Sequence, residues 1–173
     1  RRLYLGKRGG AVVAVVMCPG QGAQKVGMGR DLAEQFPAAR HTFEAIDEAL
    51  GVPLSRLMWE GPEEELVLTH NTQPAILAHS AAVFAVVRER LGPVAAGAGH
   101  SLGEYSAYVA AGSLSAPDAA RLVRRRGELM YEAGAARPGA MSAVLGLEPG
   151  AVEAACAEAS GPDGVAVAAN LNA

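Results

Sequence analysis

Ser101 is the side chain with the clearest capacity for covalent chemistry, because it lies in the stretch Gly99–Gly103, which reads GHSLG. The small residues VAAGAG at 94–99 predict a strand before it, and EYSAYVAAG at 104–112 predicts a helix after it. Strand, Gly-x-Ser-x-Gly and helix make up a nucleophile elbow, in which the glycines allow the sharp turn that lifts the serine out of the sheet. A glycine-rich turn with an incidental serine is the alternative interpretation.

Two backbone segments are candidates to stabilise the oxyanion that forms when a serine attacks a carbonyl. The helix after Ser101 begins with the N–H groups led by that of Leu102. A second glycine loop, PGQGAQ at 19–24, follows a predicted strand, and the loops at the carboxyl ends of parallel strands gather at one edge. If the two loops face each other, a backbone N–H near Gln21 completes a two-donor oxyanion hole. An ordinary turn or a phosphate-binding loop is the alternative for 19–24, but the nucleotide-binding spacings are missing.

The segments before the elbow predict one buried strand and several helices. AVVAVVM at 11–17 is β-branched and continuous, which is typical of a buried parallel strand. Residues 29–50 predict a helix that Pro37 divides into two pieces. WEGPEEEL at 59–66 predicts a turn followed by a short helix.

A central helix is predicted from residue 71 onwards, with Asn71 or Thr72 as its cap and Gly92 after its last turn. It is apolar nearly all round, which indicates a buried position. Residues 116–134 predict another helix. Beyond Pro138 the stretches 140–147, 148–160 and 164–172 predict strand, helix and strand, a βαβ fragment.

Composition excludes several classes of partner. A chain of 173 residues that is 50% hydrophobic predicts one domain, or one domain with a small appendage. A net charge of −3 with 19% charged residues offers no basic stripe for nucleic acid. Cys18 and Cys156 match no metal-ligand spacing and predict thiols in a reducing, cytoplasmic compartment. Residues 1–10 predict a flexible leader, since the apolar run after them is too short for a secretory signal or a membrane span.

Six motifs carry a resemblance to a known family. PGQGAQ, TQPA, GHSLGEY, RLVRRRGELM, GAMSAVLGL and NLN occur here in the order and spacing of the malonyl-CoA:acyl carrier protein transacylases, and the likeness covers residues 11–173. The resemblance implies an α/β fold. It implies a parallel-sheet, α/β-hydrolase-like large domain with a nucleophile elbow over 11–137, and the first half of a ferredoxin-like α+β small domain over 138–173, with both domains truncated.

The same resemblance assigns roles to individual residues. It makes Ser101 the nucleophile that accepts the malonyl group from coenzyme A, and it makes the backbone N–H groups of Leu102 and Gln21 the oxyanion donors. It makes Arg126 the group that binds the malonyl carboxylate, and a planar guanidinium suits that task better than lysine does. Without the resemblance, residues 124–126 would be read as a solvated helix face. Two weaker candidates for lining the substrate site are His100 and Gln73, whereas Glu104 is read as a first-turn helix residue.

The reaction implied by the resemblance is ping-pong transfer. Ser101 takes the malonyl group from a coenzyme A thioester, and the phosphopantetheine thiol of acyl carrier protein then takes it from Ser101. We expect no metal and no bound cofactor. The implied pathway is fatty-acid or polyketide synthesis.

The family also has a catalytic histidine in a later loop, and this sequence lacks that loop. The histidines present are His41, His70, His79 and His100, and His100 is unsuitable because neighbours at the end of a strand point to opposite faces. We therefore predict that the catalytic histidine is not in the chain and that the 173 residues alone are nearly inactive. A complementing C-terminal polypeptide is a candidate partner.

Two other functions stay open at this point. A serine hydrolase or thioesterase of the α/β-hydrolase type shares the elbow and requires an acid and a histidine downstream. A catalytically silent remnant that binds acyl carrier protein is the second alternative. A carboxylate-binding Arg126 argues against the hydrolase, and loss of function on Ser101→Ala would argue against the silent remnant.

Overall fold

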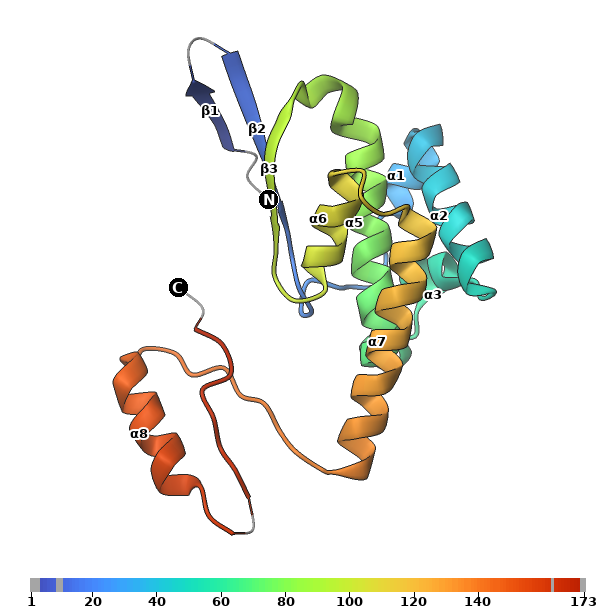
Figure 1. Cartoon of the computed structure of the whole chain (residues 1–173). Helices are drawn as coiled ribbons and strands as arrows, with labels where there is room; N and C mark the ends of the chain where they lie inside the picture. The colour runs from blue at the N-terminus through green and yellow to red at the C-terminus, as the bar shows by residue number, and fades with distance from the viewer. Residues whose placement is uncertain (1–3, 9–10, 163, 172–173) are drawn as a thin grey trace. The chain divides into compact units, whose positions relative to one another are not determined.

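Two parallel strands bring the two glycine loops to the same edge of a sheet. The structure, a computed structural model, describes residues 4–8, 11–162 and 164–171. In these residues three strands form one sheet in the order β1-β2-β3, with β1 at Tyr4–Arg8, β2 at Ala11–Cys18 and β3 at Val94–Gly99. β2 and β3 are parallel, and Cys18 pairs with Gly99 at their carboxyl ends (Figure 1). The α/β class with a parallel pair, and the strands expected at 11–17 and 94–99, are confirmed.

Strand β1 lies in the segment for which the sequence predicts a flexible leader. It runs antiparallel to β2, with Tyr4 opposite Val15 and Arg8 opposite Ala11. Antiparallel pairing gives the backbone N–H and C=O groups along the edge of β2 hydrogen-bond partners. The residue pattern of the predicted leader does not indicate this pairing with β2. Residues 1–3, 9 and 10 lie outside the described residues.

Helices cover one face of the sheet in the first of two compact units into which the described chain divides, between Arg137 and Pro138. Figure 1 shows α5 and α6 next to the strands, with α2 and α7 beyond them. The helices of this unit are α1 at Arg30–Gln35, α2 at Pro37–Leu50, α3 at Leu54–Glu60, α4 at Glu63–Leu66, α5 at Thr69–Leu91, α6 at Gly103–Ala110 and α7 at Ala116–Ala136. The break at Pro37 is confirmed. None of the helices in the described ranges is long and apolar enough to cross a membrane.

Helix α5 is the buried central helix that the sequence predicts, but it begins at Thr69 rather than beyond Asn71. Neither predicted cap residue acts as one: Asn71 Nδ2 donates to Glu65 O at 2.8 Å, and Thr72 Oγ1 donates to Leu66 O at 2.6 Å. Both side chains fasten α5 to the preceding short helix α4. The cap prediction is wrong because a polar side chain near a helix start also bonds backbone carbonyls outside its own helix.

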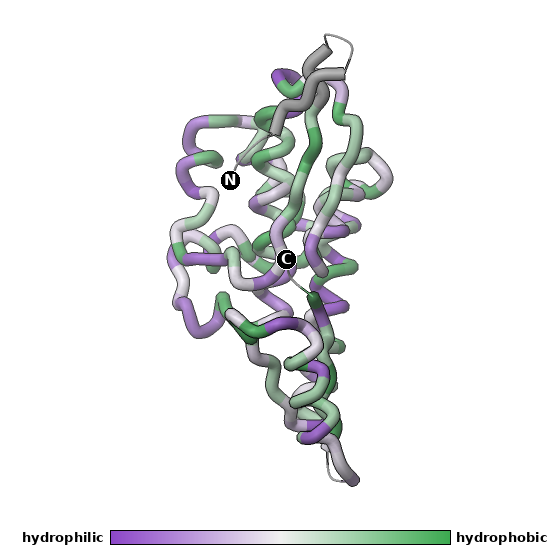
Figure 2. The backbone as a smooth tube through the Cα atoms, turned by 90° about the vertical axis from the view of Figure 1, so that its left-hand side faces the viewer, coloured by the Kyte–Doolittle hydropathy of each residue, from purple (hydrophilic) through white to green (hydrophobic). Residues whose placement is uncertain are grey.

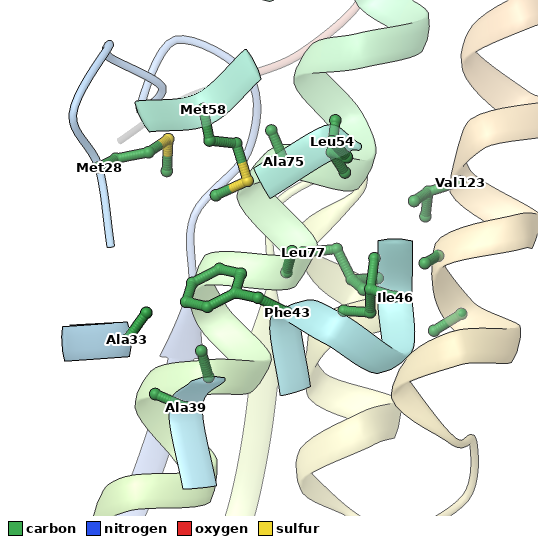
Figure 3. Close-up of a cluster of buried hydrophobic side chains, with 14 of the residues drawn as sticks. Met28, Ala33, Ala39, Phe43, Ile46, Leu54, Met58, Ala75, Leu77 and Val123 are labelled. Carbon is green, nitrogen blue, oxygen red and sulfur yellow. The ribbon is translucent and has the colours of Figure 1, made fainter. Parts of the chain in front are cut away.

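The apolar core of this unit lies between α2, α3, α5 and α7 (Figure 3). Phe43, Ile46, Met58 and Leu77 are fully buried, and each such side chain contributes about 1.5–3 kcal/mol through burial. Phe43 packs edge-on against Trp59 with ring centroids 5.7 Å apart. This core packs against α5 and α7, the two helices that carry side chains to the edge of the sheet.

The opposite face of the sheet carries apolar side chains in contact with solvent. Along β2 the burial alternates, since Ala14 and Cys18 are buried while Val15 is 40% and Met17 is 71% exposed. The helices of this first unit lie on the other side, as Figure 2 shows with the sheet toward the viewer. A parallel pair normally has both faces covered.

The second unit differs from the βαβ fragment that the sequence predicts. Its helix is confirmed as α8 at Pro149–Ala159. Within the described residues 138–162 and 164–171, however, the stretches 140–147 and 164–171 form no strand, and only an isolated bridge joins Gly161 to Gly164. Met141 and Val165 are each 81% exposed. A strand forms only when a neighbour takes its backbone hydrogen bonds, and apolar alternation does not supply that neighbour.

Candidate active site

Ser101 occupies a strained turn between β3 and α6. Its φ of 54° lies in the left-handed region, which residues other than glycine rarely adopt. The side chain is exposed, and the N-cap of α6 is the next residue, Leu102, which is fully buried. The strand, turn and helix that the sequence predicts around the serine are therefore present, with the backbone strain that holds a side chain outward.

Both glycines of the motif are required by space. A Cβ atom on Gly99 would overlap the backbone of Gly103, and a Cβ atom on Gly103 would lie 2.5 Å from Cys18 O. The turn thus folds back tightly onto the end of β2. The His100 N–H donates to Cys18 O at 3.1 Å, which continues the parallel ladder into the turn.

The two glycine loops face each other, which is the condition on which the two-donor oxyanion hole depends. A Cβ atom on Gly20 would lie 2.5 Å from the Nδ1 atom of His100 and 2.8 Å from its carbonyl oxygen. The imidazole of His100 therefore lies against the loop that carries Gln21. Packing against Gly20 therefore places the His100 side chain next to Ser101.

Arg126 reaches the serine from α7. Its Nη2 atom donates to Ser101 Oγ at 2.9 Å, and its Nη1 atom donates to Gln73 Oε1 at 2.6 Å. Gln73 comes from α5 and is fully buried. Arg126 is thus directed at Ser101, whereas Arg125 forms surface ion pairs with Glu128 and Glu132.

The hydrogen bonds continue from Gln73 to the other loop. Gln73 Nε2 donates to Thr69 Oγ1 at 3.0 Å and to Met130 Sδ at 3.3 Å. Thr69 Oγ1 lies 3.0 Å from Gln21 Oε1. One chain of contacts therefore links Ser101 to the Gln21 side chain through side chains of α7 and α5.

Helix α7 comes close to α5 because Gly127 has no side chain. A Cβ atom there would lie 2.6 Å from His70 Cα and 2.8 Å from Thr69 O. Arg124 fixes the same contact, since its Nη1 donates to Asn71 Oδ1 at 2.6 Å and to His70 O at 3.3 Å. This approach brings the neighbouring Arg126 within reach of Gln73.

The four histidines occupy different surroundings. His41 lies on α2, and the ring of His70 packs edge-on against Tyr131 with centroids 5.3 Å apart. His79 lies beside Gly29. His100 packs on Gly20.

Two carboxylates near the site have clear partners. Tyr108 Oη donates to Glu104 Oε1 at 2.9 Å, and this bond to the glutamate raises the pKa of Tyr108. Arg124 Nε donates to Glu128 Oε1 at 3.1 Å, and mainly this bond lowers the pKa of Glu128, although partial burial opposes it. Glu104 therefore forms its hydrogen bond with a residue of its own helix, α6. Among the described residues, no three His, Cys, Asp or Glu side chains gather as they would around a metal ion.

Two residues of this site escape the sequence analysis. Thr69 stands four residues before Gln73 on the same helix, a spacing that places both side chains on one face. Gly127 follows the arginine run inside a helix, where a glycine often marks a close approach. The spacing of Thr69 and Gln73 and the glycine within the helix are both visible in the sequence. Neither predicts a role in the site unless the position of a second element is known.

Known proteins provide an independent comparison. The family described as the acyl transferase domain matches residues 15–172. The malonyl CoA-acyl carrier protein transacylase of Bacillus subtilis is 49% identical over 154 residues, which are 89% of this chain and 49% of that protein. The enzyme of the same name from Escherichia coli K12 is 47% identical over 143 residues, covering 82% of this chain and 46% of that protein.

Solved structures agree. An acyl carrier protein S-malonyltransferase from Vibrio cholerae superposes with a TM-score of 0.78 at 48% identity, covering 83% of this chain and 47% of that one. A malonyl-transacylase in complex with a type II PKS acyl-carrier protein gives 0.74 at 44% identity, with coverage of 83% and 47%. This chain spans about half the length of each of these relatives. The motif resemblance is confirmed, and the chain belongs to the acyl transferase domain family.

Proposed function

We propose that this chain carries the nucleophile and the carboxylate-binding arginine of an enzyme that transfers a malonyl group from coenzyme A to acyl carrier protein. The observation that carries the proposal is the 2.9 Å contact between Arg126 Nη2 and Ser101 Oγ. In a malonyl thioester, one methylene group separates the reacting carbonyl carbon from the free carboxylate. A cation that binds this carboxylate must therefore stand directly beside the nucleophile. The names of the relatives, and the carrier protein in one of their structures, point to the same reaction.

The reaction proceeds by two acyl transfers. Ser101 Oγ loses its proton to a base and attacks the thioester carbonyl, and the oxyanion is stabilised by backbone N–H groups of Leu102 and Gln21. The C–S bond then breaks, and coenzyme A leaves as the thiol after taking up a proton. In the second half, the phosphopantetheine thiol of the carrier protein attacks the seryl ester and releases Ser101 with its proton restored. No electrons are exchanged with a cofactor.

The base in this scheme is a residue that the 173-residue sequence does not contain. His70 packs on Tyr131 and His100 packs on Gly20. The hydroxyl of Ser101 accepts its hydrogen bond from Arg126, which has no site to take up a proton. Loss of the base in comparable catalytic units lowers turnover by up to about 10⁶-fold.

A serine hydrolase or thioesterase is the second candidate. It shares the elbow, but a guanidinium held next to the nucleophile favours an acyl group with its own carboxylate over a neutral one. The two reactions differ in the acceptor, because a thioesterase passes the acyl group to water. A carrier protein with its thiol present or absent therefore separates them.

The proposal is tested with labelled malonyl-CoA and carrier protein, using the complete polypeptide that carries this sequence. We expect label on Ser101 and then on the carrier thiol, and no label in Ser101→Ala. Label that persists in Ser101→Ala would contradict the role of the serine. Release of free malonate faster than transfer to the carrier thiol would favour the hydrolase.

The isolated 173 residues provide a second test. Because they lack a base, we expect Ser101 in this polypeptide to load on the order of 10⁶-fold more slowly than in an enzyme with its histidine. Stoichiometric loading at ordinary enzymatic rates would show that one of the four histidines does act as the base.

A further inference from the structure

We propose that Thr69 is a positioning residue that joins the carboxylate-binding Arg126 to the oxyanion loop at Gln21. The inference rests on the proposed function and adds to it a residue that contacts neither substrate nor nucleophile. The side chain of Thr69 lies between Gln73 Nε2 and Gln21 Oε1, at 3.0 Å from each. It is the described residue through which the two halves of the site are connected by side-chain hydrogen bonds.

The direction of every hydrogen bond in this connection follows from the arginine. A guanidinium only donates, so the atom of Gln73 that faces Arg126 Nη1 at 2.6 Å must be the carboxamide oxygen. The amide nitrogen of Gln73 then faces Thr69 and donates to Oγ1. The hydroxyl proton of Thr69 remains for the next step and goes to Gln21 Oε1. Each side chain accepts a hydrogen bond from the one before it and donates one to the next, and successive bonds in such a chain strengthen one another.

The two ends of the connection depend on Thr69 to different degrees. Gln73 is fully buried and keeps two other partners, because its oxygen accepts from Arg126 and its nitrogen also donates to Met130 Sδ. The arginine side of the connection therefore stays ordered without the hydroxyl. Gln21 is exposed, and its loop contains Gly22 at a φ of 101°, a conformation open to few residues other than glycine. The Gln21 side chain is thus the end that loses its hydrogen bond to α5, while the packing of Gly20 against His100 remains.

This difference predicts which kinetic parameter changes. The N–H groups of the loop are needed where charge develops on the substrate oxygen, which happens in the transition state. The carboxylate contact with Arg126 exists already in the bound substrate. Loss of the Thr69 hydroxyl should therefore lower kcat and leave KM for malonyl-CoA nearly unchanged.

The test is Thr69→Val in the complete polypeptide that carries this sequence, assayed for malonyl transfer to carrier protein. Removal of a whole oxyanion donor lowers kcat by about 10²–10³-fold, so a displaced donor should lower it by about tenfold, with KM within about twofold of the parent value. Thr69→Ser retains the hydroxyl and should restore kcat. Thr42→Val is the matched control, because Thr42 bonds Ala38 O on the exposed side of α2, away from the site.

Gln21→Ala keeps the claim testable if Thr69→Val folds poorly, since the exposed Gln21 side chain contributes nothing to the core and its backbone N–H remains. We expect the same loss of kcat, and no further loss when Thr69→Val and Gln21→Ala are combined. An unchanged kcat in either single variant, or losses that multiply in the double variant, would overturn the role of Thr69. Absence of malonyl transfer by the parent protein would instead overturn the proposed function, and the present inference with it.

Discussion

Arg126 and Ser101 meet at 2.9 Å although they come from different elements, the arginine from the middle of α7 and the serine from the turn after β3. Gln73 holds the guanidinium from its other side. The arginine is therefore oriented before any acyl group arrives, and little side-chain entropy remains to be lost when a carboxylate binds. Under the proposed function, this arrangement favours an acyl group that carries its own carboxylate.

Replacement of Arg126 by lysine should weaken malonyl transfer selectively. The ammonium group keeps the charge but cannot contact Gln73, the serine and both carboxylate oxygens together. We expect kcat/KM for malonyl-CoA to fall by about tenfold to a hundredfold, the value of one charge-assisted hydrogen bond. Transfer of an acetyl group, measured in the same assay, should not fall. Arg125→Lys is the control, and an equal loss in that variant would contradict the assignment.

The substitution Gly127→Ala should separate α7 from α5. The new methyl group would lie 2.6 Å from His70 Cα, and we expect a destabilisation of about 1–3 kcal/mol with a loss of malonyl selectivity. Gly134→Ala on the same helix meets no atom within 4 Å and should instead stabilise the chain by about 0.5–1 kcal/mol. Thermal or denaturant unfolding of both variants measures the difference. Equal stabilities would show that the helices are not in close contact at Gly127.

Glu128 should contribute a stability that depends on pH. Mainly through its hydrogen bond from Arg124, its pKa in the folded chain lies below the ordinary value of 4.5. The contribution is therefore present above that ordinary value and is lost as the pH falls through the lowered pKa. Unfolding of Glu128→Gln and of the parent chain should differ at neutral pH and converge in acid. A difference that grows in acid would give the opposite sign and contradict this reasoning.

Met17 should promote association of the isolated 173-residue chain. It is 71% exposed on a sheet face whose neighbours Val15 and Ala98 are also exposed. An exposed apolar sheet face is an aggregation hazard, and a lysine on it is a common protection. Met17→Lys should therefore lower the concentration-dependent light scattering of this chain. Lys25→Met, which adds an apolar side chain in a loop, is the control and should not raise scattering to the same extent.

The sequence predicts the elements of the first unit well where local signals agree. The strands that end at Cys18 and Gly99, the break at Pro37 and the helix after the elbow all follow from patterns within a few residues. The beginning of α5 and the strand β1 do not, because the first depends on bonds from Asn71 to α4 and the second on pairing with β2.

The candidate site shows the same limit. Ser101 and its glycines are predicted from the turn itself, because the constraint is local. From the sequence, only the family resemblance distinguishes Arg126 from the neighbouring arginines of a solvated helix face. The reason is that its position depends on contacts with α5 and with the turn at Ser101, which are distant in the sequence. The strands expected after residue 138 illustrate the reverse case, in which a strong local pattern has no pairing partner among the described residues. The ferredoxin-like second domain accordingly stays a prediction.

Gly127 contacts no substrate in the proposed scheme, yet it allows the close approach of α7 to α5 on which the site depends. The absence of a Cβ atom at Gly127 lets α7 lie directly against the first residues of α5, and the residue before it, Arg126, donates to Ser101 Oγ. Under the proposed function, the acyl groups that are accepted can therefore be altered at the crossing of α5 and α7 as well as at Arg126 itself. A larger side chain at residue 127 would displace the helix that carries Arg126, so any change in selectivity would come with a loss of stability.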